Sequence, residues 1–177
     1  MNLYSIALFL HVVGALLLFV TLAVEGVALR QLSQAATTEL ARGAAALLRL
    51  NRIVGPLSAL GVLVPGLYMT VTSWGWVAWI VVALASWVVI AVLGAVNGIR
   101  ILALERSSGL LAGIGNPVFL TSWLARVGIA LGVIFLMTVK PGSVVAVIAI
   151  LGPAAAGALL GIALSKTRRR ERAADAA

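Results

Sequence analysis

Five long apolar segments alternate with shorter polar intervals along this chain. A helix needs about 20 mainly apolar residues to cross the ~30 Å hydrocarbon core of a bilayer, and each segment reaches that length. The pattern therefore predicts an all-α, polytopic integral membrane protein with a five-transmembrane-helix bundle. The expected spans are 3–29, 53–72, 76–99, 118–139 and 143–164.

The polar intervals indicate how the spans connect. The links at 73–75 and 140–142 are so short that the spans on either side should form antiparallel hairpins. In the largest interval, residues 30–52, we expect an amphipathic helix that Thr38 caps and that leads into the second span. Residues 1–165 then form one transmembrane domain, and residues 166–177 form a basic cytoplasmic tail.

Composition strengthens the assignment to the membrane. Hydrophobic residues make up 63% of the chain and charged residues 10%, and the mean hydropathy is +1.16. A water-soluble domain of 177 residues could not bury that much apolar surface in one core. The sequence has no cysteine, which excludes disulfides and thiolate metal sites.

The positive charges predict the orientation. Twelve of the 13 lysines and arginines fall at one side of the predicted bundle, and Lys140 falls at the other. Because basic residues concentrate on the cytoplasmic side, we expect a cytoplasmic membrane of bacterial type, an external N-terminus and a cytoplasmic C-terminus. The basic tail is then an anchor on anionic lipid, and nucleic acid is not an expected partner. Its basic residues are Lys166, Arg168, Arg169, Arg170 and Arg172.

Tryptophans and glycines fit the same layout. Trp74, Trp76 and Trp79 surround the short external turn, where indole rings favour the headgroup boundary, so we interpret them as anchors rather than ligand-stacking groups.

Three spans carry pairs of glycines four residues apart, and such pairs let neighbouring helices approach closely. These pairs are Gly94 and Gly98, Gly128 and Gly132, and Gly157 and Gly161.

Ionisable residues within spans are costly and need a partner or a purpose. One group falls in the predicted inner half: Glu25, Asn97, Arg100 and Arg126. A salt bridge from Glu25 to Arg126 or to Arg100 would neutralise both charges. We favour a role in stability and assembly, with a proton or ion pathway as the alternative, because a relay needs several carboxylates in series.

A second group falls in the predicted outer half: His11, Tyr68, Met69, Met137 and Lys140. One imidazole and two thioethers would suit Cu(I), or His11 and a methionine could be axial ligands of haem b. The alternative is that His11 bonds a neighbouring backbone group and that the methionines fill gaps in the packing. With a single histidine, one chain cannot supply bis-histidine ligation, although a homodimer could.

Short motifs in three spans suggest a family. The sequence contains Leu8-Phe9-Leu10-His11-Val12-Val13-Gly14-Ala15, Gly66-Leu67-Tyr68, and Leu136-Met137-Thr138-Val139-Lys140-Pro141 after Arg126-Val127-Gly128. In these motifs the chain resembles an uncharacterised bacterial integral-membrane family, domain-of-unknown-function family 2269, over residues 3–141. That family is distantly similar to the membrane domain of copper-resistance protein D.

This resemblance implies a link to copper or haem and places His11 and Met137 at motif positions. The chain departs from a copper or haem pattern in two respects. It has no second histidine, and a fifth span follows Pro141.

Enzymatic motifs are not found. His11 and Glu25 lie roughly 21 Å apart along one helix, too far for a Ser-His-acid set. The glycines at 109, 113 and 115 lack the Gly-Lys-Ser/Thr ending of a phosphate-binding loop.

We therefore expect a non-enzymatic membrane protein embedded in the bilayer. It would be a small permease-like or cofactor- or metal-handling protein with a site in the outer half of the bundle. One alternative is an accessory or anchoring subunit that binds partner membrane subunits or a second copy. Another is a haem-binding electron-transfer subunit.

Overall fold

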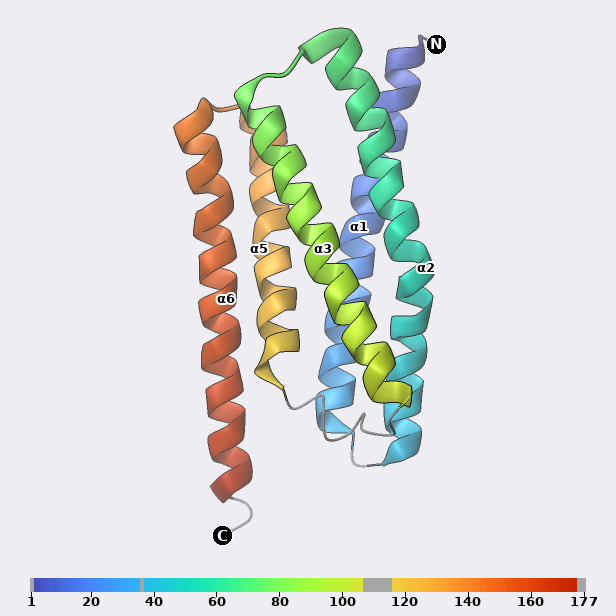
Figure 1. The fold of residues 1–177 in the computed structure, drawn as a ribbon, viewed down its shortest axis with the longest axis vertical. Helices are drawn as coiled ribbons and strands as arrows, with labels where there is room; N and C mark the ends of the chain where they lie inside the picture. The colour runs from blue at the N-terminus through green and yellow to red at the C-terminus, as the bar shows by residue number, and fades with distance from the viewer. Residues whose placement is uncertain (1, 36, 107–115, 175–177) are drawn as a thin grey trace.

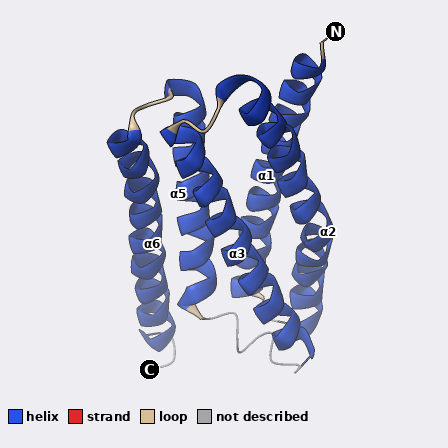
Figure 2. Cartoon of the chain, turned by 45° about the horizontal axis from the view of Figure 1, so that its top comes forward, coloured by secondary structure: helices blue, strands red, loops and turns tan. Residues whose placement is uncertain are grey.

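The computed structural model describes residues 2–35, 37–106 and 116–174, with the side chains at 38 and 168–174 outside the described part. The described residues form helices joined by short links, as Figures 1 and 2 show. In chain order they are α1 (Leu3–Gln34), α2 (Thr38–Met69), the π-helix η1 (Thr70–Trp74), α3 (Ala78–Arg106), α5 (Pro117–Val139) and α6 (Ser143–Ala174). Consecutive long helices run antiparallel, so α1 starts and α6 ends at opposite ends of the bundle.

The prediction of an all-α bundle with five candidate spans is confirmed. Five helices are long and apolar enough to cross a membrane, judged by length and composition. Their outer surfaces expose valine, leucine and isoleucine side chains, which water would not solvate favourably but lipid would. The fold is therefore that of a multi-pass membrane protein.

The interval at 30–52 is more regular than expected. Helix α1 continues to Gln34 and α2 begins at Thr38, so the amphipathic segment and the second span are one helix. The predicted cap was wrong by one residue, because the hydroxyl of Thr37 accepts the hydrogen bond from Leu40 N at 3.4 Å. Alanines and one leucine spaced at helical intervals bury this part of α2 against α1. They are Ala41, Ala44 and Leu48 on α2, and Ala28, Leu29 and Leu32 on α1.

Two closely packed helix pairs make up most of the bundle. Helix α1 packs along α2, and α5 packs along α6, whereas the tilted α3 packs mainly on α5 and contacts α2 only sparsely. Glycine explains the first pair. A Cβ at Gly14 would lie 2.5 Å from the carbonyl carbon of Gly61, so only a hydrogen at this position allows α1 and α2 to approach.

Glycine pairs also determine the packing of α5 on α6. Gly128 faces the Pro153 carbonyl and Gly132 the Ala149 carbonyl, and both contacts exclude a larger residue. The predicted pair in the third span was wrong in its role. Gly94 instead leaves room for the Arg126 side chain, and a Cβ at Gly98 would meet no atom within 4 Å. The space beside Gly98 is the first sign of a cavity along α3.

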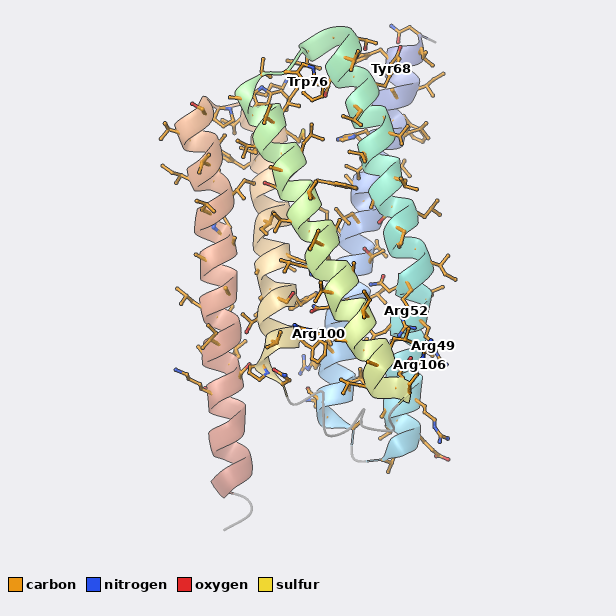
Figure 3. The ribbon with its side chains drawn as sticks, viewed as in Figure 1. Arg49, Arg52, Tyr68, Trp76, Arg100 and Arg106 are labelled. Atoms are coloured by element: carbon orange, nitrogen blue, oxygen red, sulfur yellow. The ribbon has the colours of Figure 1, made fainter. Side chains whose placement is uncertain are left out.

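Basic and aromatic residues occupy opposite ends of the bundle. Figure 3 shows Arg49, Arg52, Arg100 and Arg106 near one end, which we call the basic end. Tyr68 and Trp76 lie near the other, which we call the aromatic end. The separation of charge that the spans predict is therefore present in the folded chain.

Candidate ligand cavity between helices α1, α2 and α3

A cavity of about 630 Å³ lies where α3 diverges from α2. Its walls come from α1, α2 and α3, and Arg126 reaches it from α5. Some lining side chains also face the outer surface of the bundle, including Leu60 on α2 and Ile99 on α3. The cavity therefore opens sideways between α2 and α3, towards the surface that lipid would cover. Its volume is typical of small-molecule sites.

Most of the residues that line this cavity are apolar. Leu18, Leu60 and Trp87 line the part near the middle of the bundle. Asn51 and Arg52 line the part near the basic end, which we call the mouth. The cavity is thus mainly apolar, with polar side chains at its mouth.

A buried ion pair forms part of the cavity wall. Arg126 Nη2 donates a hydrogen bond to Glu25 Oε1, and only 4% and 5% of the two residues' surfaces are exposed. The structure thus pairs Glu25 with Arg126, one of the two arginines that the sequence left open, while Arg100 lies exposed on α3. Neutralisation by a partner is what makes such charges tolerable inside a membrane protein.

The pair leaves one hydrogen-bond donor of Arg126 unused. Among the described residues, its buried Nε has no hydrogen-bond partner. Gly94 contributes the space for the guanidinium, since a Cβ there would lie 3.1 Å from Arg126 Nη1. A buried donor without an acceptor carries a desolvation cost.

Neighbouring hydrogen bonds hold the Arg126 segment of α5 in place. Asn97 is buried and donates from Nδ2 to Ser122 Oγ at 3.1 Å, which joins α3 to α5. Trp123 donates from Nε1 to the Leu22 carbonyl at 2.8 Å, which joins α5 to α1. Its indole packs where Gly26 has no side chain. Arg126 is therefore presented to the cavity by a segment that contacts both flanking helices.

A second ion pair lies at the mouth of the cavity. Arg52 Nη2 on α2 lies 3.2 Å from Glu105 Oε2 on α3, and their side chains are 31% and 18% exposed. The other oxygen of Glu105, Oε1, has no hydrogen-bond partner among the described residues. This pair is one of the few direct links between α2 and α3.

His11 bonds to the backbone of α2. Its Nδ1 lies 2.8 Å from the Val62 carbonyl oxygen, and its ring packs against Gly66. Because a carbonyl oxygen only accepts, Nδ1 is the protonated nitrogen. This is the backbone-bonded alternative that the sequence left open for His11.

The other outer-half candidates are dispersed. Met69 is buried in α2, and Tyr68 beside it is partly buried. Met137 packs beside a core cluster that Ile90, Ile129 and Ile150 build from α3, α5 and α6. No hydrogen bond of the described residues joins His11 to a methionine, and these residues contain no group of three or more His, Asp or Glu side chains that could hold a metal. We derive no copper or haem chemistry from this arrangement, and the outer-half site stays a prediction.

Lys140 lies at the aromatic end in a small cluster. It ends α5 in the left-handed conformation, at φ 52° and ψ 54°, and its Nζ lies 4.0 Å from the centroid of the Trp74 ring. Trp74 in turn donates to the Tyr4 hydroxyl at 3.1 Å and contacts Trp79 edge to face at 5.8 Å. These contacts link α1, η1, α3 and α5 at the end opposite the cavity mouth.

The basic tail is described only in part. Lys166 is exposed on α6. The side chains of Arg168, Arg169, Arg170 and Arg172 lie outside the described residues, as do the glycines at 109, 113 and 115.

Sequence reasoning missed the pairing of Arg52 with Glu105 and the position of Trp87 in the wall of the cavity. Both charges were assigned to polar intervals between spans, whereas the helices extend through them. Trp87 gives a usable signal, because it lies near the middle of its predicted span, far from the interfaces that tryptophan favours.

Comparison with known proteins gives no family for this chain: no protein-family model, curated protein or solved structure matches it.

Proposed function

We propose that this protein binds an amphiphilic molecule from the bilayer in the cavity between α1, α2 and α3. In this proposal it is a small, non-enzymatic, permease-like or ligand-carrying membrane protein. The observation that carries the proposal is the largely apolar cavity of about 630 Å³, which is lined by Arg52 and by the buried Glu25–Arg126 pair. The sideways opening favours a ligand that arrives through the membrane rather than from water.

The proposal moves the site from the outer half, where the sequence suggested it, to the inner half. The lining is mainly apolar, and it includes the donors of Asn51 and Arg52 near one end. A ligand with a chain and an oxygen-bearing head matches both features, because the chain replaces lipid contacts and the head supplies acceptors.

We place the protein in a bacterial-type cytoplasmic membrane, with the basic end on the cytoplasmic side. The support is the separation of Arg49, Arg52, Arg100 and Arg106 from the aromatic end. The cavity mouth then lies at the level of the inner-leaflet headgroups.

The test is to detect the ligand and then to fill the cavity. Gly55 and Gly98 both line it, and a Cβ at either position would meet no atom within 4 Å, so Gly55→Leu with Gly98→Leu adds bulk to the cavity from two unobstructed positions. Gly152→Leu is the matched control, because this glycine is equally unobstructed but does not line the cavity. The full chain is purified in mild detergent, and native mass spectrometry measures the molecules that it retains.

We expect the wild type and the Gly152→Leu control to retain a chain-bearing molecule that the double variant loses. Equal retention by all three proteins, or none by the wild type, would contradict the proposal. The same preparation tests the other hypotheses: stoichiometric partner chains would favour an accessory subunit, and a Soret band or bound copper would favour the outer-half site.

A further inference from the structure

The mouth of the cavity carries more positive than negative charge. Arg52 lines the cavity and contacts Glu105, while Arg49 lies one turn before it on α2 and Arg106 follows Glu105 on α3. Figure 3 shows the three arginines together at this end of α2 and α3, with Arg100 apart from them. Three guanidinium groups therefore share one nearby carboxylate. An anion at this position would balance the excess positive charge of the three arginines.

The cavity is long enough for a lipid chain. Its lining on α3 extends from Trp87 to Leu102, which is ~22 Å along the helix axis. One leaflet of the hydrocarbon core is ~15 Å thick. A chain whose head lies at Arg52 can thus extend past Gly98 and Ala95 to Trp87 without leaving the cavity.

A second acceptor position lies deeper than the mouth. Glu25 already neutralises the Arg126 guanidinium, so a second anion there would be an uncompensated charge in a buried site. Where the Arg126 guanidinium lines the cavity, its N–H groups suit an uncharged acceptor instead, such as a carbonyl oxygen. The two polar positions therefore differ in kind: the mouth fits an anion, and the wall fits a neutral oxygen.

We propose that the occupant is a phosphate-bearing amphiphile with an ester carbonyl, that is, an anionic glycerophospholipid-like molecule. Its phosphate contacts Arg52, Arg49 and Arg106, its carbonyl oxygen accepts from the Arg126 guanidinium, and one chain extends to Trp87. Phosphate suits this cluster because arginine binds its oxygens with paired, charge-assisted hydrogen bonds, and its several oxygens can accept from more than one arginine. This inference rests on the proposed function and adds the chemical class of the ligand.

The test measures binding of defined lipids to the delipidated full chain in a neutral detergent. The probes are dioleoyl phosphatidylglycerol, dioleoyl phosphatidylcholine and inorganic phosphate, with affinities from native mass spectrometry and from shifts in melting temperature. We expect phosphatidylglycerol to bind about tenfold more tightly than phosphatidylcholine, and its advantage to shrink as salt is added. Inorganic phosphate at matched concentration should neither shift the melting temperature nor compete.

Two variants test the arginines. Arg49→Gln with Arg106→Gln removes two exposed charges and keeps the Arg52–Glu105 pair, so the protein should fold normally. We expect this double variant to lose the preference for phosphatidylglycerol and to bind both lipids with similar affinity. Arg100→Gln, the matched control at the same end of α3, should bind like the wild type. An equal loss in Arg100→Gln would show that general surface charge, and not the cluster at the mouth, attracts the lipid, and would overturn the inference.

The carbonyl contact has its own probe. A diether analogue of phosphatidylglycerol keeps the head and chains but lacks the carbonyl oxygen, so it should bind several-fold more weakly than the diester. Equal affinity would overturn the contact with Arg126.

The remaining outcomes separate this inference from the proposed function. If both lipids bind equally, and Gly55→Leu with Gly98→Leu abolishes binding of both, the headgroup assignment is wrong and the cavity proposal stands. If neither lipid binds the wild type, both are wrong. If inorganic phosphate competes with phosphatidylglycerol, the mouth is a free-anion site and the amphiphile inference is overturned.

Discussion

Buried charged and polar side chains in this bundle depend on specific partners. Glu25 and Arg126 are each almost fully buried, and each is acceptable only because of the other. His11 is acceptable because a carbonyl oxygen of α2 accepts a hydrogen bond from its Nδ1–H. Arg126 bears both on stability and on the proposed ligand binding, because it pairs with Glu25 and lines the cavity.

Replacement of Glu25 tests the ion pair. Glu25→Gln keeps the shape and leaves Arg126 buried without a counter-charge, so we expect a loss of about 3–5 kcal/mol of stability. Thermal unfolding in detergent should show a melting temperature lower by roughly 10 °C. Glu39→Gln, an exposed carboxylate on α2, should change stability by less than about 0.5 kcal/mol. An unchanged melting temperature in Glu25→Gln would count against the pair.

Removing both charges should reverse much of the loss. Glu25→Gln combined with Arg126→Met replaces the pair with neutral groups, and such replacements are often neutral or stabilising. We expect the double variant to melt above Glu25→Gln alone. A double variant that melts lower still would show that Arg126 stabilises the bundle through contacts other than Glu25.

Replacement of His11 tests its structural role. His11→Ala removes the interhelical hydrogen bond to Val62, and we expect a loss of about 1 kcal/mol in stability. The visible absorption spectrum and the metal content should not change. If the substitution instead removes a Soret band or bound copper, His11 is a ligand and the outer-half site returns as the leading hypothesis.

At the scale of helices, glycine determines which helix pairs pack closely and which leave a space between them. Gly128 has no room for a side chain, whereas Gly98 on α3 has open space beside it. The same residue type therefore acts in opposite ways on neighbouring helices. One allows packing, and the other borders the cavity.

This difference predicts opposite effects of substitution. Gly128→Val would push a side chain into the backbone of α6, and we expect it to cost about 3 kcal/mol or to prevent folding. Gly98→Ala should raise stability by up to about 1 kcal/mol, because alanine favours the helix and meets no atom. Thermal unfolding of both variants checks the prediction, and destabilisation by Gly98→Ala would mean that this space is not free.

At the scale of the molecule, orientation is open to direct measurement. The chain has no cysteine, so a single introduced thiol reports the side of the membrane it faces. We expect an impermeant maleimide to label Ser73→Cys, near the aromatic end, in intact cells. Gly43 is exposed on α2, and it precedes in sequence the α2 residues that line the cavity. Gly43→Cys should react only after permeabilisation. The reverse pattern would place the cavity mouth outside.

The sequence was sufficient to predict the five candidate spans, because each apolar run exceeds the thickness of a bilayer. Depth along the helices also predicted that Glu25 has an arginine partner. The choice of Arg126 over Arg100 could not be predicted, because it depends on how α3 and α5 rotate about their axes. The cavity could not be predicted either, since it arises from the tilt of α3 and not from any motif.

The contacts among Tyr4, Trp74, Trp79 and Lys140 hold four elements together at one end of the bundle, while α2 and α3 touch only sparsely along the rest of their length. At the other end α3 approaches α2, and the Arg52–Glu105 ion pair joins the two helices. The opening between α2 and α3 is thus bounded at both of its ends. A ligand that enters between these two links would leave both tight helix pairs as they are.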